Sequence, residues 1–186
     1  MGAVIFTRVS PLPLNLSREE QKKIDRIINK LRRLDKQSLI SYWITAELDE
    51  AETYNNLAWR TREYSWDPRI PELFEELAEE STKHAEILLN EYKRTYPKEK
   101  LIETDIPSIE LELSLEDLEE YIRSGRLEDL VSVLMESEKI AEEIYRYLAE
   151  ESSGDTKRLF EHLADVERGH YQKLKTLMES IKKEDG

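Results

Sequence analysis

Two stretches of this sequence repeat one another and decide the fold. Residues 39–58 read LISYWITAELDEAETYNNLA, and residues 130–149 read LVSVLMESEKIAEEIYRYLA. Identical residues recur 91 positions later at Leu39, Ser41, Glu47, Tyr54, Leu57 and Ala58. An internal repeat of this kind indicates that the chain contains the same structural unit twice.

A second repeat follows the first in each half of the chain. Residues 73–89, LFEELAEESTKHAEILL, align with residues 159–175, LFEHLADVERGHYQKLK, at an offset of 86. The offset is shorter because the loop WRTREYSWDPRIPE, residues 59–72, carries extra residues, and loops tolerate insertions at little cost. Each half is therefore predicted to be one antiparallel helical hairpin.

The hydrophobic pattern predicts four long helices and one shorter helix before them. Apolar residues recur every three or four positions in four segments, residues 37–64, 68–95, 126–152 and 155–183. Asp67-Pro68 and Gly154-Asp155 are typical of helix starts. The capping-box pattern S-R-E-E at residues 17–20 predicts an accessory helix from Ser17 to about Leu34, after an extended arm over residues 1–16.

The segment between the two halves, residues 96–113, has no helical period and contains two prolines. A helix of about 28 residues is about 42 Å long, whereas about 17 extended residues reach about 56 Å. The segment can thus cross the whole bundle, which is the long-crossover topology of ferritin-like folds. The alternative, a disordered linker, would leave each hairpin unable to bury its apolar stripe.

These patterns together predict an all-α, ferritin-like four-helix bundle made of two repeated hairpins, with an extra N-terminal helix. We assign residues 1–36 to the N-terminal arm and accessory helix. Residues 37–183 form a single bundle domain, whose crossover spans about residues 96–125.

Composition excludes several classes of function. The net charge of −13 argues against nucleic acid or an anionic membrane as a partner. The absence of cysteine excludes disulfides, cysteine-bound zinc, iron–sulfur clusters and an attached rubredoxin-type module. No stretch approaches the length of a membrane span. We therefore expect a cytoplasmic protein with neither nucleic-acid nor membrane partners.

The apolar stripe of each long helix is interrupted near its middle by acidic or imidazole side chains. Buried, unpaired carboxylates on facing helices are strongly disfavoured, and bound cations would compensate for them. Carboxylate oxygens with one imidazole per ion suit iron or manganese, with zinc possible. One Glu from each of two helices, with a Glu-x-x-His from each of the other two, is the pattern of di-metal carboxylate bundles, and Glu167-x-x-His170 matches it. The candidate ligands are Glu47, Glu50, Glu80, His84, Glu138, Glu167 and His170.

Several neighbouring residues have simpler interpretations. His162 falls off the apolar stripe and is predicted to be a surface histidine. Tyr54 and Tyr145 are predicted to be core residues with hydroxyls near the site, and Trp43 is predicted to be core packing.

Residues 37–182 resemble the rubrerythrin-like branch of the ferritin-like superfamily. The motif E-x-x-A-x-x-x-Y-x-x-L-A stands at residues 138–149, and the partner motif L-A-E-E-E-x-x-H-A stands at residues 77–85. In the second motif Ser81 replaces the last Glu. The resemblance implies a metal-ligand set of Glu47, His84, Glu138, Glu167 and His170.

The departure at Ser81 puts a full set of bridging carboxylates in question. Glu80 lies one turn before His84, and Glu50 lies one turn after Glu47. Either could take the place of the missing carboxylate. Our hypothesis is an asymmetric di-metal site that is weaker at its His84 half.

The resemblance implies a non-haem di-iron oxidoreductase that reduces peroxide or reacts with dioxygen. Since the chain has no cysteine, the electrons would come from an external donor protein, and a homodimer is expected for the family. Two alternatives stay open. The chain could bind and store iron as a ferroxidase, or it could be a structural bundle whose metal site has degenerated.

Overall fold

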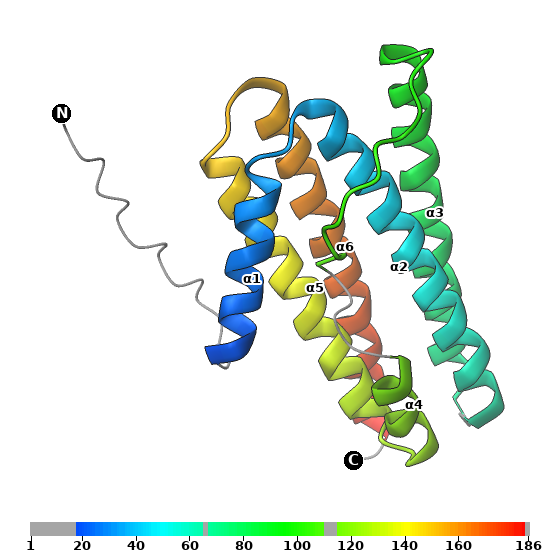
Figure 1. Cartoon of the computed structure of the whole chain (residues 1–186). Helices are drawn as coiled ribbons and strands as arrows, with labels where there is room; N and C mark the ends of the chain where they lie inside the picture. The colour runs from blue at the N-terminus through cyan, green and yellow to red at the C-terminus, as the bar shows by residue number, and fades with distance from the viewer. Residues whose placement is uncertain (1–17, 65–66, 110–114, 185–186) are drawn as a thin grey trace.

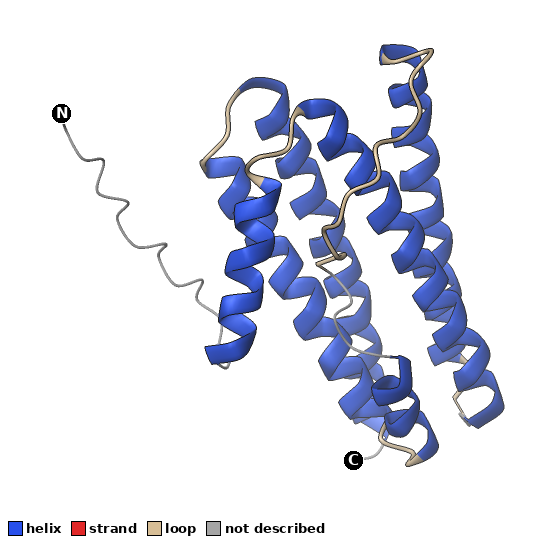
Figure 2. Cartoon of the chain, in the orientation of Figure 1, coloured by secondary structure: helices blue, strands red, loops and turns tan. Residues whose placement is uncertain are grey.

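The protein is an all-α bundle. The computed structural model describes residues 18–64, 67–109 and 115–184, and these residues form helices and no strand (Figures 1 and 2). The helices are α1 (Arg18–Leu31), α2 (Lys36–Tyr64), α3 (Arg69–Thr95), α4 (Leu115–Arg123), α5 (Leu127–Glu150) and α6 (Gly154–Glu184).

Four long helices form two antiparallel hairpins, α2 with α3 and α5 with α6, which lie side by side (Figure 1). Their bounds agree with the sequence prediction to within two residues. Local chemistry explains two of the starts: the Asp35 carboxylate accepts a hydrogen bond from the Ser38 backbone N–H at 2.8 Å, and Asp67 accepts one from Arg69 N–H at 3.0 Å. The predicted ferritin-like four-helix bundle is confirmed.

The crossover runs from the end of α3 back along α2 (Figure 1). Tyr92 Oη donates to the carbonyl of Lys100 at 2.6 Å, and the N–H of Ile102 donates to Ser41 Oγ at 3.1 Å. Further along, Tyr42 Oη donates to the Pro107 carbonyl at 3.1 Å. The crossover is therefore bonded to α3 at Lys100 and to α2 at Ile102 and Pro107, and over these residues it is not a free linker.

Two short helices complete the described chain. Helix α4 lies inside the segment assigned to the crossover, and it was not predicted because it spans only nine residues, about two and a half turns. Helix α1 ends at Leu31, three residues before the predicted end, and lies along α5, where Arg32 contacts Tyr147 Oη at 3.0 Å. The predicted cap at Ser17 and the arm over residues 1–16 lie outside the described residues.

The core is divided into two hydrophobic clusters. One joins α1, the N-terminal half of α2 and the facing halves of α5 and α6, and it includes Trp43 and Phe160. The other joins the C-terminal half of α2, the N-terminal half of α3, α4, the N-terminal half of α5 and the C-terminal half of α6, and it includes Phe74 and Leu134. The buried polar side chains in the middle of the four long helices include Glu47, Glu50, Ser81, Glu138, Glu167 and His170. Helix α1 packs into the first cluster together with α2, α5 and α6. This packing does not test the boundary at residue 36, which stays a prediction.

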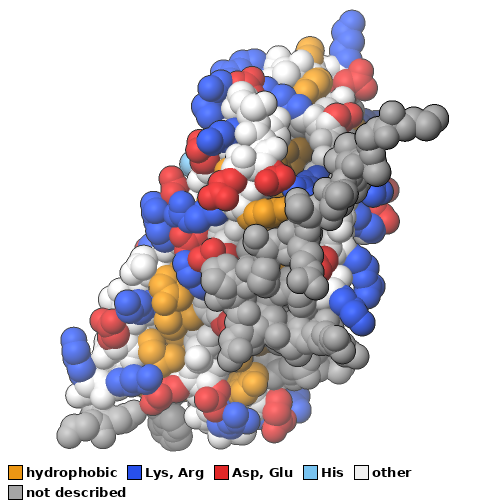
Figure 3. Space-filling model, turned by 90° about the vertical axis from the view of Figure 1, so that its left-hand side faces the viewer, with side chains coloured by type: hydrophobic (Ala, Val, Ile, Leu, Met, Phe, Trp, Pro, Cys, Tyr) orange, Lys and Arg blue, Asp and Glu red, His pale blue; other side chains and the backbone are white. Residues whose placement is uncertain are grey.

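The surface carries intermixed charges. On the face drawn in Figure 3, Lys and Arg side chains alternate with Asp and Glu. In the part of the chain that the structure describes, no helix combines the length and the apolar character that a membrane crossing needs.

Candidate metal centre

The candidate ligands come from the middle turns of all four long helices. Helix α2 provides Glu47 and Glu50, and α5 provides Glu138. Residues three apart lie on one face of a helix, so each such pair points in the same direction. In α6 this spacing brings Glu167 and His170 together on the face that meets the other helices.

Four of these side chains form a compact group. Glu50, Glu138, Glu167 and His170 are all buried, and one potential ligand atom from each lies within 4.8 Å of those of the other three. His170 Nδ1 lies 3.3 Å from a Glu50 oxygen and 3.8 Å from oxygens of Glu138 and Glu167. The group therefore presents three carboxylates and one imidazole nitrogen to a single small volume.

The other half of the centre consists of Glu47 and His84. His84 Nδ1 lies 3.5 Å from Glu47 Oε2, and the ring centroids of His84 and His170 are 6.2 Å apart with nearly parallel planes. His84 is 27% exposed, whereas the side chain of His170 is only 2% exposed. The His84 half is thus the side of the centre that is open to solvent.

Three carboxylates of the centre are held by hydrogen bonds from outside it. Trp43 Nε1 donates to Glu47 Oε1 at 2.9 Å, and Ser81 Oγ donates to Glu50 Oε2 at 2.8 Å. Tyr54 Oη donates to Glu138 Oε1. In each case one oxygen is held, and the other is directed toward the neighbouring ligand atoms. These bonds fix the carboxylates in place before any ion binds.

The inner atoms of the same side chains lack hydrogen bonds. Among the described residues, no partner within bonding geometry is found for Glu47 Oε2, Glu50 Oε1 or Glu138 Oε2, nor for His84 Nδ1 or either ring nitrogen of His170. Buried polar atoms without partners are costly, and buried carboxylates still more so. Divalent cations at the centre would provide these atoms with partners, so the side chains present fit a metal site of mixed oxygen and nitrogen donors.

The electrostatics of the metal-free centre favour bound protons. Burial raises the pKa of the Glu50 carboxyl to about 8, and the nearby charges of Glu138 and Glu47 add to the effect. Burial alone would lower the pKa of His170, but the carboxylates of Glu50 and Glu138 outweigh it and hold this pKa well above its usual range. Protons therefore neutralise part of the charge that cations would otherwise compensate.

Tyr54 stays protonated in this setting. Burial and the charge of Glu138 raise the pKa of its phenol well above the usual value. Its hydroxyl is thus a permanent donor to Glu138. This hydroxyl was predicted to lie near the site, and its bond to Glu138 bears that out.

Of the seven predicted ligands, six lie together at the centre and Glu80 lies at its rim. Glu80 is 34% exposed and forms an ion pair with Lys173, whose Nζ is 2.6 Å from Glu80 Oε1. The other oxygen, Glu80 Oε2, lies 3.9 Å from His170 Nε2. This carboxylate therefore faces the outer nitrogen of His170, while the other six side chains share the interior.

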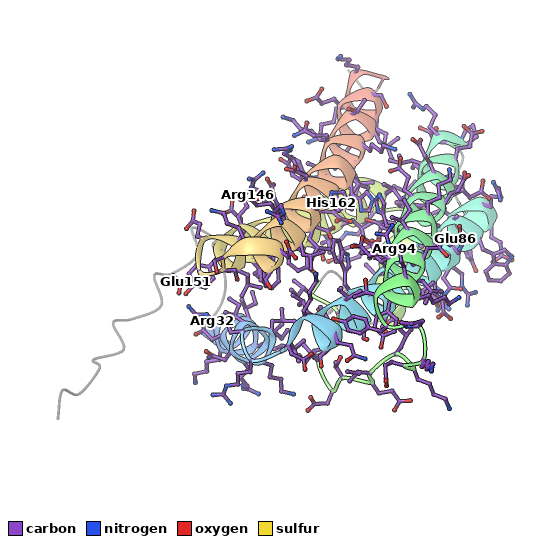
Figure 4. All side chains as sticks on the ribbon, turned by 90° about the horizontal axis from the view of Figure 1, so that it is seen from above. Arg32, Glu86, Arg94, Arg146, Glu151 and His162 are labelled. Atoms are coloured by element: carbon purple, nitrogen blue, oxygen red, sulfur yellow. The ribbon has the colours of Figure 1, made fainter. Side chains whose placement is uncertain are left out.

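The sequence prediction missed roles for Trp43, Ser81 and His162. Trp43 was predicted as core packing; it is buried, but its spacing of four residues from Glu47 also makes it a hydrogen-bond donor. His162 is exposed, as predicted, and points from α6 toward α3 (Figure 4). Its ring lies 5.9 Å from that of Trp43 and 6.5 Å from that of His84, between centroids. No motif in the sequence signals these ring contacts, because they depend on side chains from three helices.

Comparisons with known proteins agree with this architecture. The family model described as Rubrerythrin matches residues 39–178. Among solved structures, the chain is similar to the "Hypothetical Protein Pfu-1136390-001" from Pyrococcus furiosus, with 29% sequence identity and a TM-score of 0.57. That match covers 82% of this chain and 93% of the other. A search of curated proteins gives no match.

Proposed function

Because this chain belongs to the rubrerythrin family, we propose that it is a non-haem di-iron oxidoreductase that reduces peroxide, or reacts with dioxygen, with electrons from an external donor. The observation that carries the proposal is the arrangement of the central carboxylates. Each of Glu47, Glu50 and Glu138 has one oxygen held from outside and one inner oxygen without a hydrogen bond. Such an arrangement favours cation binding over a salt-bridged structural core.

We propose that two iron ions bind to six side chains at the centre, with manganese or zinc as possible substitutes. The proposed ligands are Glu47, Glu50, His84, Glu138, Glu167 and His170. Glu80 is a weaker candidate because Lys173 holds one of its oxygens and the other faces the outer edge of His170. A carboxylate in that position orients a histidine ligand through its second nitrogen.

With two iron(II) ions bound, the centre would supply the two electrons that, together with two protons, reduce one peroxide to two waters. The chain's own residues prepare the site for this chemistry. Trp43, Tyr54 and Ser81 fix the carboxylates, so that little reorganisation accompanies the reaction. The two hydrophobic clusters exclude water from both ends of the centre. The more exposed His84 leaves its own side as the route by which a small oxidant enters.

The remaining parts of the proposal concern partners. The sequence contains no cysteine, so these 186 residues hold no thiolate-bound iron that could return electrons to the centre. We therefore propose a separate one-electron donor protein. A homodimer in the cytoplasm completes the proposal, and sedimentation of the purified protein tests the dimer.

The test is stoichiometric. Metal-free protein is loaded with iron(II) under anaerobic conditions, freed of excess metal and analysed for iron. One equivalent of hydrogen peroxide per chain is then added, and iron oxidation and peroxide loss are followed by stopped-flow absorbance. We expect two irons per chain and one peroxide consumed for every two iron(II) ions. Dioxygen in place of peroxide shows which oxidant reacts faster.

Matched variants on one helix sharpen the result. Glu167→Gln removes a central carboxylate, whereas Glu161→Gln alters an exposed carboxylate on the same helix. Only the first is expected to reduce iron content and peroxide consumption. Many irons per chain in a large hollow assembly would favour the storage alternative. Failure of the wild-type protein to retain iron would favour a degenerate structural bundle.

A further inference from the structure

The internal repeat allows the ligand positions of one hairpin to be compared with those of the other. At the offsets of 91 and 86, Glu47 corresponds to Glu138, and His84 corresponds to His170. The two other central positions of each hairpin do not match. Glu50 corresponds to Ala141, and Ser81 corresponds to Glu167. Each hairpin thus provides two carboxylates and one imidazole, but the second carboxylate stands on the first helix of one hairpin and on the second helix of the other.

The two mismatched residues of the first hairpin are in direct contact. Ser81 Oγ donates to Glu50 Oε2 at 2.8 Å, between α3 and α2, and both side chains are almost completely buried. A Glu side chain at position 81 has three more heavy atoms than Ser and reaches two bonds further along this line. In this rotamer its carboxyl group would therefore enter the space that the Glu50 carboxylate fills, so a Glu at both positions would require one of the two side chains to move.

We propose that Glu50 and Ser81 together replace one ligand: the carboxylate has moved from α3 to α2, and Ser81 is a positioning residue that holds it. The small side chain at position 81 leaves the required space, and its hydroxyl fixes one oxygen of Glu50. The other oxygen lies 3.3 Å from His170 Nδ1. On this basis, Ser81 is not a defect of the metal site. This inference rests on the proposed function, in which the centre binds two metal ions.

The relocation makes the two metal positions unequal. With Glu50 in the group around His170, one position has three carboxylates and one imidazole within 4.8 Å. The other position has Glu47 and His84 as its own ligands and must share further carboxylates with the first. The closed group therefore binds the first ion, and the more solvent-exposed half at His84 binds the second, weaker ion.

The experiment moves the carboxylate back. Metal-free wild type, Glu50→Ala, Ser81→Glu and the double variant Glu50→Ala/Ser81→Glu are titrated with cobalt(II) under anaerobic conditions. Equilibrium dialysis gives the number of ions bound, and the ligand-field absorption of cobalt reports their coordination. We expect two ions bound in two steps by the wild type, one by Glu50→Ala and two again by the double variant.

A smaller change tests the positioning role of the hydroxyl. Ser81→Ala keeps Glu50 but removes the donor, and it is expected to weaken binding of the first ion about 10- to 100-fold with two ions still bound. Thr82→Ala is the matched control, because within the described part of the chain the Thr82 hydroxyl donates to the carbonyl of Ala78 in its own helix, at 2.8 Å, and to no candidate ligand. This control should bind cobalt as the wild type does.

Melting temperatures without metal provide a separate readout. Ser81→Glu places two carboxyl groups in one space and should lower the melting temperature by about 5 °C, while the same change in the Glu50→Ala background should lower it much less. The inference is overturned if the double variant binds no more cobalt than Glu50→Ala, or if Ser81→Glu costs the same in both backgrounds. A wild type that binds no cobalt overturns the proposed function, and this inference with it.

Discussion

The metal-free protein should become less stable as the pH rises from 5 to 8. The pKa of Glu50 rises from 4.5 to about 8 on folding because the carboxyl is buried. Between those values the folded chain holds a proton that the unfolded chain has released. At about 1.4 kcal/mol per pH unit, ionisation of Glu50 in the unfolded chain favours unfolding by about 5 kcal/mol at pH 8 and above.

His170 acts in the same direction. Its pKa is also raised on folding, so the folded chain keeps the imidazolium above pH 6.5, where the unfolded chain loses it. The stability from this proton is fully present below pH 6.5 and is lost as the pH rises through the higher folded pKa. Surface carboxylates with lowered pKa values, such as Asp35 and Asp67, lose their contribution only in more acidic solution.

The assay is thermal unfolding of chelator-treated protein at pH 5.5, 7.0 and 8.5, followed by circular dichroism. Glu50→Gln removes the titrating carboxyl but keeps an oxygen that can accept from Ser81. For a chain of this size about 5 kcal/mol corresponds to about 10 to 20 °C. The variant should therefore melt about that much higher than the wild type at pH 8.5, and only slightly higher at pH 5.5.

Two controls test whether this effect is specific to Glu50 and to the metal-free protein. Glu52→Gln changes an exposed carboxylate on the same helix and should follow the wild-type profile. Metal-loaded protein should show the opposite trend, because ion binding requires deprotonated ligands and strengthens as the pH rises. A metal-free stability that is flat or increases from pH 5.5 to 8.5, or equal melting of Glu50→Gln and wild type at pH 8.5, would refute the reasoning.

Three further predictions concern single residues. Gly169 lies in α6 where an added Cβ would meet no atom within 4 Å, so Gly169→Ala should raise the free energy of unfolding by about 1 kcal/mol in urea titrations; destabilisation would reveal a hidden contact. Tyr54→Phe removes the donor to a buried carboxylate and should lower the same quantity by about 1 to 3 kcal/mol, whereas an unchanged urea midpoint would show that the bond contributes nothing. Glu80→Gln should weaken cobalt binding about tenfold if its carboxylate orients His170, and Glu79→Gln, at an exposed neighbouring position, should not.

The fold could be predicted because its signals are long and repeated. Each main helix contains several turns of the same apolar period, so single exceptions do not hide it. Helix α4 shows the limit: among its described side chains, at residues 118–123, Leu118 and Ile122 are buried in the second cluster, too few to establish a period. The sequence also could not show that the crossover is fixed to α2, since the bonds at Ser41 and Tyr42 join residues more than sixty positions apart.

The sequence indicates which candidate side chains lie together, but it does not indicate the hydrogen bonds that they make. Six candidate ligands lie together because they occupy the inner faces of neighbouring helices at the same height. Glu80 differs from Ser81 by one residue, or about 100° around the helix, which is enough to move it from the interior to the rim. The contact between Ser81 and Glu50 depends on the separation of two helices and on one side-chain rotamer. The spacing of residues in the sequence determines neither.

The bond from Trp43 to Glu47 has an optical consequence. The indole is almost completely buried, and its N–H group is bonded to a proposed ligand, so its fluorescence should be blue-shifted and should respond to an ion at the centre. Trp59 is exposed, and its emission can be quenched separately by iodide. Trp66 lies outside the described residues, and a Trp43→Phe difference spectrum removes its contribution. Trp43 is thus an intrinsic fluorescent probe at the centre. Its emission can be used to time the binding of a paramagnetic ion without any added label.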